Sequence, residues 1–295
     1  MSVVPARSPL SVVIATAEPW PVIKPCLDRI VPQVLAVGGE VIVGDGHERG
    51  VSDDLPGVRR VPVPGADVFE IRALVADLVD SDIVVFTEDH CMAESDWCER
   101  ILAAHEAHPE AALIGGAMRN GSTRRLVDWA NFLPVFAPFM PPMTRARGDR
   151  VPPPGNISYK RDALPREATA GELIIDIPRR LHIEGKVVMD PTILMSHVQE
   201  KGFFGSFVNH FHNGRSTAGL ALVGASRDAR RRHRRTAIRA AYRLMGRVSG
   251  DVLKQPTPLK SRLALPFVGV AILTHTLGEV VGSMRGPGNS PTRIT

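Results

Sequence analysis

The sequence predicts an α/β protein, with a mostly parallel sheet flanked by helices and a helical C-terminal region. Three observations favour this class. Strand-like and helix-like segments alternate between residues 10 and 118, as in doubly wound sheets. Polar clusters follow the predicted strands, and the composition changes near residue 222. At 295 residues and 44% hydrophobic composition, the chain is long enough for one large α/β domain and an appendage.

Runs of β-branched and other apolar residues predict the strands. These strands are 10–16, 40–46, 61–63, 82–87, 111–117 and 186–198. Apolar residues at helical spacing predict helices at 21–35, 69–78, 96–105 and 171–183. Ser95 is the expected N-cap of the third helix. We expect His210 and His212 to lie in a loop.

Three cysteines, Cys26, Cys91 and Cys98, form neither an even set nor a paired metal-type spacing. A reducing cytosol therefore fits better than a secreted, disulfide-rich context, and we expect no disulfide. The apolar run 10–15 is soon closed by Glu18 and Pro19. It is better explained as a strand than as a signal peptide or a first membrane span.

Positive charge is concentrated in one segment. The net charge is +5, but residues 227–247 hold nine arginines and one acid, Asp228, and the rest of the chain holds 27 basic and 30 acidic residues. Five arginines recur every four residues: Arg231, Arg235, Arg239, Arg243 and Arg247. Ile238, Ala241, Tyr242 and Met245 form an apolar stripe on the same segment. This pattern predicts a basic amphipathic helix with one anionic partner, either nucleic acid or membrane headgroups.

The segment 263–278 is uncharged and is interrupted by Pro266. Its sixteen residues fall short of the roughly 20 that a spanning helix needs. We expect an interfacial or re-entrant segment, and a buried core helix is the alternative. Together with the arginine helix, this segment favours an anionic membrane surface as the partner.

Polar clusters at the ends of three predicted strands are the candidate site: Thr16–Glu18, Asp45–His47 and Glu88–His90. In parallel sheets, ligands lie at the carboxyl ends of the strands. Glu88, Asp89 and His90 offer oxygen and nitrogen ligands to a divalent cation, which could bridge a diphosphate and act as a Lewis acid. Asp45 could accept a hydrogen bond from a base or ribose. The alternatives are a polar turn before the next helix for Glu88–His90 and an ordinary Gly-Asp-Gly turn for Asp45.

The order of these features resembles family 2 glycosyltransferases of the GT-A fold, in the nucleotide-diphospho-sugar transferase superfamily. The motifs are an opening strand Ser11–Thr16, the aspartate Asp45, and Glu88-Asp89-His90 in the place of a DxD motif, followed by Trp97. Gly155-Asn156 before Tyr159–Arg161 is similar to the segment beside the sugar and acceptor. Glu172, Arg180, Gly185, Pro191 and His197 follow the family's acid, helix, glycine, strand, proline and histidine pattern. The resemblance covers about two-thirds of the chain.

The resemblance implies transfer of a sugar from a nucleotide-diphosphate donor to an acceptor hydroxyl, with inversion and with a divalent metal, Mg²⁺ or Mn²⁺. It implies the following roles: metal ligands Glu88, His90 and His197; donor contacts from Thr16, Glu18, Asp45, Asp89 and Asn156; and a general base, Glu172 or Asp176. Glu-x-His replaces the usual Asp-x-Asp, although both groups are competent ligands. For His197 a core histidine is the alternative role, and for Glu172 a first-turn acid stabilised by the helix dipole.

We therefore expect a catalytic domain at 1–222 and a basic and apolar helical region at 223–295. The expected location is the cytoplasmic, inner face of the plasma membrane, and the expected acceptor is a lipid-linked or membrane-proximal glycan, as in cell-envelope polysaccharide synthesis. The alternatives are a non-catalytic nucleotide-sugar-binding relative and a nucleic-acid-binding protein that uses the arginine helix. Only 5% of the residues are aromatic and no nucleic-acid module is recognisable, so we expect no nucleic-acid partner. The identity of base, sugar and acceptor depends on a mobile or acceptor-facing loop at 132–154, and the oligomeric state stays open.

Overall fold

The computed structural model describes residues 7–47, 55–143, 151–152, 155–199, 201–254 and 256–294. The chain forms two compact units. The sheet unit comprises residues 1–119 and 143–196, and the helical unit comprises 120–142 and 197–295. Residues 197–222 thus belong to the helical unit by their contacts, while the expected catalytic boundary at residue 222 stays a prediction.

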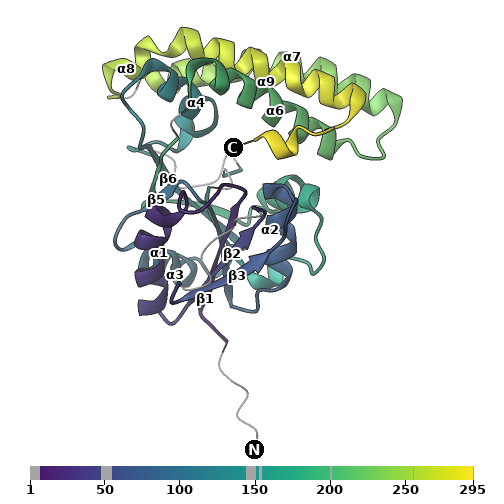
Figure 1. Ribbon diagram of the computed structural model, residues 1–295. Helices are drawn as coiled ribbons and strands as arrows, with labels where there is room; N and C mark the ends of the chain where they lie inside the picture. Colours follow the sequence, from purple (N-terminus) through teal and green to yellow (C-terminus); the bar gives the residue numbers. More distant parts are fainter. Residues whose placement is uncertain are drawn as a thin grey trace, which may run out of the picture. The chain divides into compact units, whose positions relative to one another are not determined.

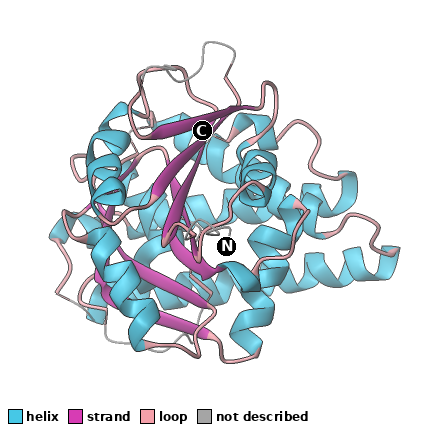
Figure 2. Cartoon of the chain, turned by 90° about the horizontal axis from the view of Figure 1, so that it is seen from below, coloured by secondary structure: helices cyan, strands magenta, loops and turns pink. Residues whose placement is uncertain are grey.

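Eight strands form one sheet in the order β3-β2-β1-β4-β7-β6-β8-β5. Their bounds are β1 Leu10–Thr16, β2 Glu40–Asp45, β3 Val58–Pro62, β4 Ile83–Glu88, β5 Cys91–Ala93, β6 Leu113–Asn120, β7 Asn156–Lys160 and β8 Val187–His197. Strands β1, β2, β3 and β4 pair in parallel, whereas β7 pairs antiparallel with both β4 and β6. The α/β class is confirmed, and the sheet is mixed. Figure 2 shows its twist from strand to strand.

Helices flank the sheet because each buries one apolar side against it. They are α1 Lys24–Ala36, α2 Val68–Asp77, α3 Trp97–Ala107 and α5 Ile177–Ile183, with a 3₁₀ turn η2 Arg161–Ala163 and a π-helical turn η3 Glu172–Asp176. Figure 1 shows α1 and α3 on one face of the sheet and α2 on the other. The core on the α2 side includes Val13, Ile71, Phe86, Leu173 and Ile177. The core thereby links α2 with the η3–α5 segment.

The N-termini of α2 and α3 differ in their capping. Asp67 accepts hydrogen bonds from the N–H groups of Phe69 and Glu70, and the Glu70 side chain accepts one from the N–H of Asp67. This is a capping box at the start of α2. The prediction of Ser95 as the N-cap of α3 is wrong, because Asp96 occupies that position and makes no side-chain cap.

The helical unit contains α4 Leu126–Phe136, η1 Ala137–Phe139, α6 Phe203–Ala221, α7 Arg227–Lys254, α8 Leu259–Leu263, α9 Leu265–Arg285 and η4 Pro291–Arg293. Figure 1 shows α6, α7 and α9 side by side. The predicted loop at 132–154 is wrong for residues 132–139, which are helical; residues 144–150, 153 and 154 lie outside the described part. His210 and His212 are buried on α6 and are not loop residues.

Helix α9 is longer than the uncharged run predicted. It has 21 residues because it starts at a proline-containing first turn and continues past Glu279 to Arg285. By length and composition it is the one helix in the described part of the chain that could cross a membrane, and 33% of its most apolar window is buried within the protein. Such a helix is also found in the cores of soluble proteins.

Candidate active site

Three potential metal ligands converge where strands end. Glu88 is the last residue of β4, His90 lies in the turn between β4 and β5, and His197 is the last residue of β8. Each residue offers one ligand atom, and these atoms all lie within 4.8 Å of one another. Because β1 pairs with β2 and β4, Thr16 lies opposite Asp45 and Ala15 lies opposite Glu88. The expectation that the polar clusters gather at one edge of the parallel strands is confirmed.

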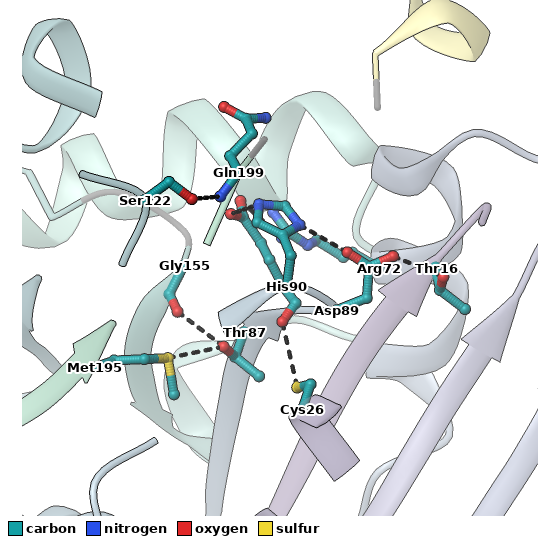
Figure 3. Close-up of polar contacts among 11 residues, drawn as sticks. Thr16, Cys26, Arg72, Thr87, Asp89, His90, Ser122, Gly155, Met195 and Gln199 are labelled. Carbon is teal, nitrogen blue, oxygen red and sulfur yellow. Dashed lines mark hydrogen bonds and ion pairs between the residues drawn. The ribbon is translucent and has the colours of Figure 1, made fainter. Parts of the chain in front are cut away.

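A chain of short hydrogen bonds ties His90 to β1. The Thr16 hydroxyl donates to one Asp89 oxygen at 2.7 Å, and the other Asp89 oxygen lies 2.7 Å from Nδ1 of His90 (Figure 3). Nε2 of His90 lies 3.4 Å from Glu88 Oε2. Asp89 and Thr16 are buried. Asp89 therefore orients the His90 ring, as carboxylates behind metal-bound imidazoles do.

The two carboxylates also set the charge of His90. Burial lowers its pKa, but the hydrogen bonds with Asp89 and Glu88 outweigh burial and raise the pKa to about 10. In the metal-free protein His90 is therefore a cation that balances part of the negative charge of its neighbours. A metal bound at Nε2 would replace that proton.

Arg72, a buried residue of α2, also belongs to the site, although no sequence motif indicates it. Its guanidinium lies 3.3 Å from Glu88 Oε1, whereas Glu88 Oε2 is the carboxylate oxygen that faces His90. The only sequence signal was a cation within an otherwise apolar helical stretch. Arg72 fixes the Glu88 carboxylate so that Oε2 is directed to the ligand cluster.

His197 lies against two aromatic rings. Its imidazole is 4.8 Å from the ring of Phe136 and 6.2 Å from that of Phe132, centroid to centroid. His197 is 6% exposed. His197 therefore matches both expected roles in part. It is packed like a core histidine, and it also presents a nitrogen near the potential ligand atoms of Glu88 and His90.

One carboxylate and two imidazoles are competent ligands for a divalent transition-metal ion. The fit rests on three convergent ligand atoms and on the Asp89 contact that orients one of the rings. Mg²⁺ prefers oxygen ligands, so two imidazoles favour Mn²⁺ over Mg²⁺.

Two predicted donor-binding residues hold structural contacts. Asp45 accepts hydrogen bonds from Nε of Arg60 at 2.9 Å and from the N–H of His47 at 3.0 Å. The Glu18 N–H donates to the Thr16 hydroxyl at 3.2 Å, which fixes the loop after β1. The turn expected as the alternative for Asp45 is thus present, and its role toward a nucleotide stays a prediction.

The side-chain amide of Asn156 forms hydrogen bonds within the sheet unit. Its oxygen accepts from Trp97 Nε1 at 2.9 Å, and its nitrogen donates to the carbonyls of Ala117 and Ile193, each at 3.0 Å. Gly116 makes room for it, since a Cβ there would overlap the amide. These contacts connect α3, β6, β7 and β8, and the donor contact of Asn156 stays a prediction.

The two candidate bases lie on the exposed side of η3. Glu172 accepts hydrogen bonds from the N–H and hydroxyl of Thr169, which lower its pKa. Asp176 is exposed at the end of the same turn. The lowered pKa weakens Glu172 as a base, and its contacts match the first-turn role expected as its alternative. A π-helical turn is rare and frequent at functional sites.

A small cavity lies beside this turn. Arg72, which also contacts Glu88, lines the cavity together with Phe86, Tyr159, Leu173, Ile174 and Pro178. Leu173 and Ile174 belong to the turn that carries Glu172 and Asp176. Arg72 therefore contacts one expected metal ligand and lines a cavity that the turn also lines.

The fold and site define an α/β protein with a candidate divalent-metal centre at the carboxyl ends of parallel strands. The chain is similar to crystal structures of glucosyl-3-phosphoglycerate synthase from Mycobacterium tuberculosis. The complex with Mn²⁺, UDP-glucose and phosphoglyceric acid has 19% identity and a TM-score of 0.49, and the match covers 74% of this chain and 80% of that one. The complex with Mn²⁺, UDP and phosphoglyceric acid has 20% identity and a TM-score of 0.48, over 72% and 77% of the two chains.

A structure described as a mycobacterial protein matches with 18% identity and a TM-score of 0.49, over 74% of this chain and 75% of that one. No family model and no curated protein matches the chain. At these identities and TM-scores the likeness decides neither activity nor family. The case for a function therefore depends on the site itself.

Proposed function

We propose that this protein is a metal-assisted glycosyltransferase that moves a sugar from a nucleotide-diphosphate donor to an acceptor hydroxyl. The observation that carries the proposal is the convergence of Glu88, His90 and His197, whose ligand atoms lie within 4.8 Å, at the ends of strands β4 and β8. A divalent cation there would bind a pyrophosphate and stabilise the charge on the departing nucleotide.

The chain's own residues would divide the work around that cation. Glu88, His90 and His197 would hold it, Asp89 would orient His90, and Arg72 would orient Glu88. Thr16, Glu18 and Asp45 remain the proposed donor contacts at the neighbouring strand ends. Asp176 or Glu172 would take the proton of the acceptor hydroxyl, and we favour Asp176 because Thr169 lowers the pKa of Glu172.

The finer form of the proposal concerns acceptor and location. We propose a lipid-linked or membrane-proximal glycan as acceptor, inversion at the anomeric carbon, and work at the cytoplasmic face of the plasma membrane. The exposed position of Asp176 suits direct deprotonation of an acceptor, as inversion by a single displacement requires. The arginine-rich α7 supports an anionic surface as neighbour.

The test combines metal binding with nucleotide release. Mn²⁺ binding is followed by electron paramagnetic resonance, and release of nucleoside diphosphate is measured with a panel of nucleotide sugars and acceptors. His90→Ala should weaken Mn²⁺ binding by at least about tenfold and reduce release in proportion. His108→Ala, which removes a half-exposed histidine of the same unit, should leave both unchanged. Equal Mn²⁺ affinity for the native protein and His90→Ala would remove the metal centre from the proposal.

The same assay shows whether Asp176 or Glu172 is the general base, and it also tests the non-catalytic alternative. Asp176→Asn should lower release about 10²-fold or more while Mn²⁺ affinity stays the same, as removal of a general base does, and Glu172→Gln should have the smaller effect. Binding of a nucleoside diphosphate, seen as a thermal shift, without turnover on any acceptor would favour the non-catalytic relative.

A further inference from the structure

The helices α6 and α9 bury mainly small or polar residues and expose several large apolar ones. Five of the seven buried residues of α9 are small or polar, namely Ala271, Thr276, Gly278, Gly282 and Ser283, and the other two are Val268 and Ile272. Leu263 on α8 and Val270, Leu273, Leu277 and Met284 on α9 are 44–67% exposed. On α6 the buried set includes Ser206, His210, Gly214, Ser216 and Gly219, whereas Phe203, Phe204 and Val208 are exposed. In water-soluble proteins helices bury their large apolar side chains.

Glycines allow the two helices to touch backbone to backbone. A Cβ at Gly278 would overlap the Phe211 carbonyl oxygen, one at Gly282 would overlap that of Arg215, and one at Gly214 would overlap that of His275. Close approach through small residues is the way helices associate in lipid, where burial of large side chains brings no gain.

The exposed large apolar residues of α9 form one stripe. Positions 270, 273, 277 and 284 are spaced by three, four or seven residues, so they share one side of the helix, and Leu263 precedes them on α8. From residue 270 to residue 284 the stripe is about 20 Å long at about 1.5 Å per residue. At its start Phe267 packs 5.7 Å from Phe203, which adjoins Phe204, and Phe204 is 81% exposed. Aromatic residues are common where a helix meets the membrane interface.

The arginine helix α7 lies antiparallel beside α9. Arg230 Nη1 donates to the carbonyl of Ser283 at 3.2 Å, His233 lies 3.7 Å from Glu279, and Met245 lies next to Gly269. Seven of the nine arginines of α7 are exposed: Arg227, Arg231, Arg232, Arg235, Arg239, Arg243 and Arg247. Positive charge therefore runs along the full length of the apolar stripe.

We infer that the α6–α9 face docks in the plane of an anionic lipid bilayer, with the stripe in the headgroup and acyl boundary and the α7 arginines against the lipid phosphates. Two observations select this occupant: the exposed apolar stripe needs an apolar solvent, and the charge beside it needs anions. A spanning orientation is disfavoured because α7 lies along α9, so a spanning α9 would carry the arginines into the hydrocarbon. The inference depends on the helical unit alone, and it stands whether or not sugar transfer occurs.

Vesicle flotation of the full chain tests the inference. Vesicles of phosphatidylcholine and phosphatidylglycerol (3:1) should bind the protein, pure phosphatidylcholine should bind it weakly, and high salt should reduce binding. Leu273→Glu/Leu277→Glu should lower partitioning by about tenfold or more, with unchanged circular dichroism and melting because both side chains are exposed. Leu74→Glu/Leu78→Glu, an exposed pair formed by a residue of α2 and its C-cap residue, should leave partitioning unchanged. Arg235→Gln/Arg239→Gln should lower anionic binding roughly fivefold per arginine.

Four outcomes would overturn the inference. If Leu273→Glu/Leu277→Glu binds vesicles as well as the native protein does, then the stripe does not contact the bilayer. Dimerisation that the same variant abolishes, without vesicle binding, would make a second copy the occupant. Salt-sensitive binding to DNA or RNA that exceeds binding to anionic vesicles would assign the arginines to nucleic acid. Release from native membranes only by detergent, and not by high salt, would indicate a spanning helix.

Discussion

The sheet unit and the helical unit differ in what they bury. The sheet unit buries Ile14, Ile42, Val85 and Trp97, so its stability depends on removing large apolar surface from water. In the helical unit α6 and α9 meet through Gly214, Gly278 and Gly282, and many of their large apolar side chains, such as Phe204, Leu273 and Leu277, are exposed. One chain thus combines an apolar core under its sheet with a helix pair in backbone contact, and this difference is the basis of the proposed lipid neighbour.

The strongest test of this difference adds one methyl group where α6 and α9 are in backbone contact. Gly278→Ala places a Cβ against the Phe211 carbonyl and the Arg215 N–H, and neither backbone group can move without shifting α6. We expect a loss of about 3 kcal/mol or more in the unfolding free energy of the helical unit. Hydrogen exchange should show lost protection in α6 and α9, with β1 and β4 unchanged.

Gly246→Ala on α7 is the matched control. Nothing lies within 4 Å of a Cβ there, and alanine is the better helix former, so we expect stabilisation by about 0.5–1 kcal/mol. Equal effects of the two substitutions would mean that α6 and α9 are not in backbone contact.

The same difference explains what the sequence could predict. The strand at 10–16 and the bounds of β2 and β4 follow from buried β-branched runs, which are legible without knowledge of neighbours. Helix α6 was missed because its buried positions are glycine, serine and histidine, which form no apolar stripe. Helix α4 was missed because Pro134 and apolar residues all round hide its period.

The three potential metal ligands could be predicted from the sequence, but the residues that orient them could not. Glu88 and His90 are neighbours in sequence, and His197 followed from motif order. Arg72 reaches Glu88 only through the packing of α2 against β1, which no local pattern shows. The hydrogen bonds of Asp45 and Asn156 with other groups of the protein could not be predicted either, because hydrogen bonds between distant segments depend on strand register.

Asn156 tests the structural side of the sheet unit. Asn156→Ala would leave the Trp97 N–H and two carbonyls without their partner in a buried place. We expect a loss of about 2–3 kcal/mol in the unfolding free energy, measured by urea denaturation. Asn289→Ala, at an exposed position of the helical unit, should cost little. A stable Asn156→Ala protein that has lost nucleotide binding would instead restore the predicted donor contact.

The smallest effect concerns pH, and it distinguishes the polar interior of the helical unit. Burial lowers the pKa of His210 to about 4, with smaller contributions in the same direction from the neighbouring His275 and Lys201, against about 6.5 in an unfolded chain. Below pH 6.5 the unfolded state takes up a proton that the folded state refuses until about pH 4. The contribution of neutral His210 is therefore fully present above pH 6.5 and is lost as the pH falls from 6.5 to 4.

Between pH 7.5 and pH 5 we expect this group to cost about 1–2 kcal/mol in unfolding free energy. The measurement is hydrogen exchange of α6 amides at both pH values in the native protein and in His210→Gln, which cannot titrate. The pH-dependent loss should shrink in His210→Gln and persist in His108→Gln, which alters the sheet unit. If both variants keep the full loss, then a neutral His210 is not what stabilises α6 above pH 6.5.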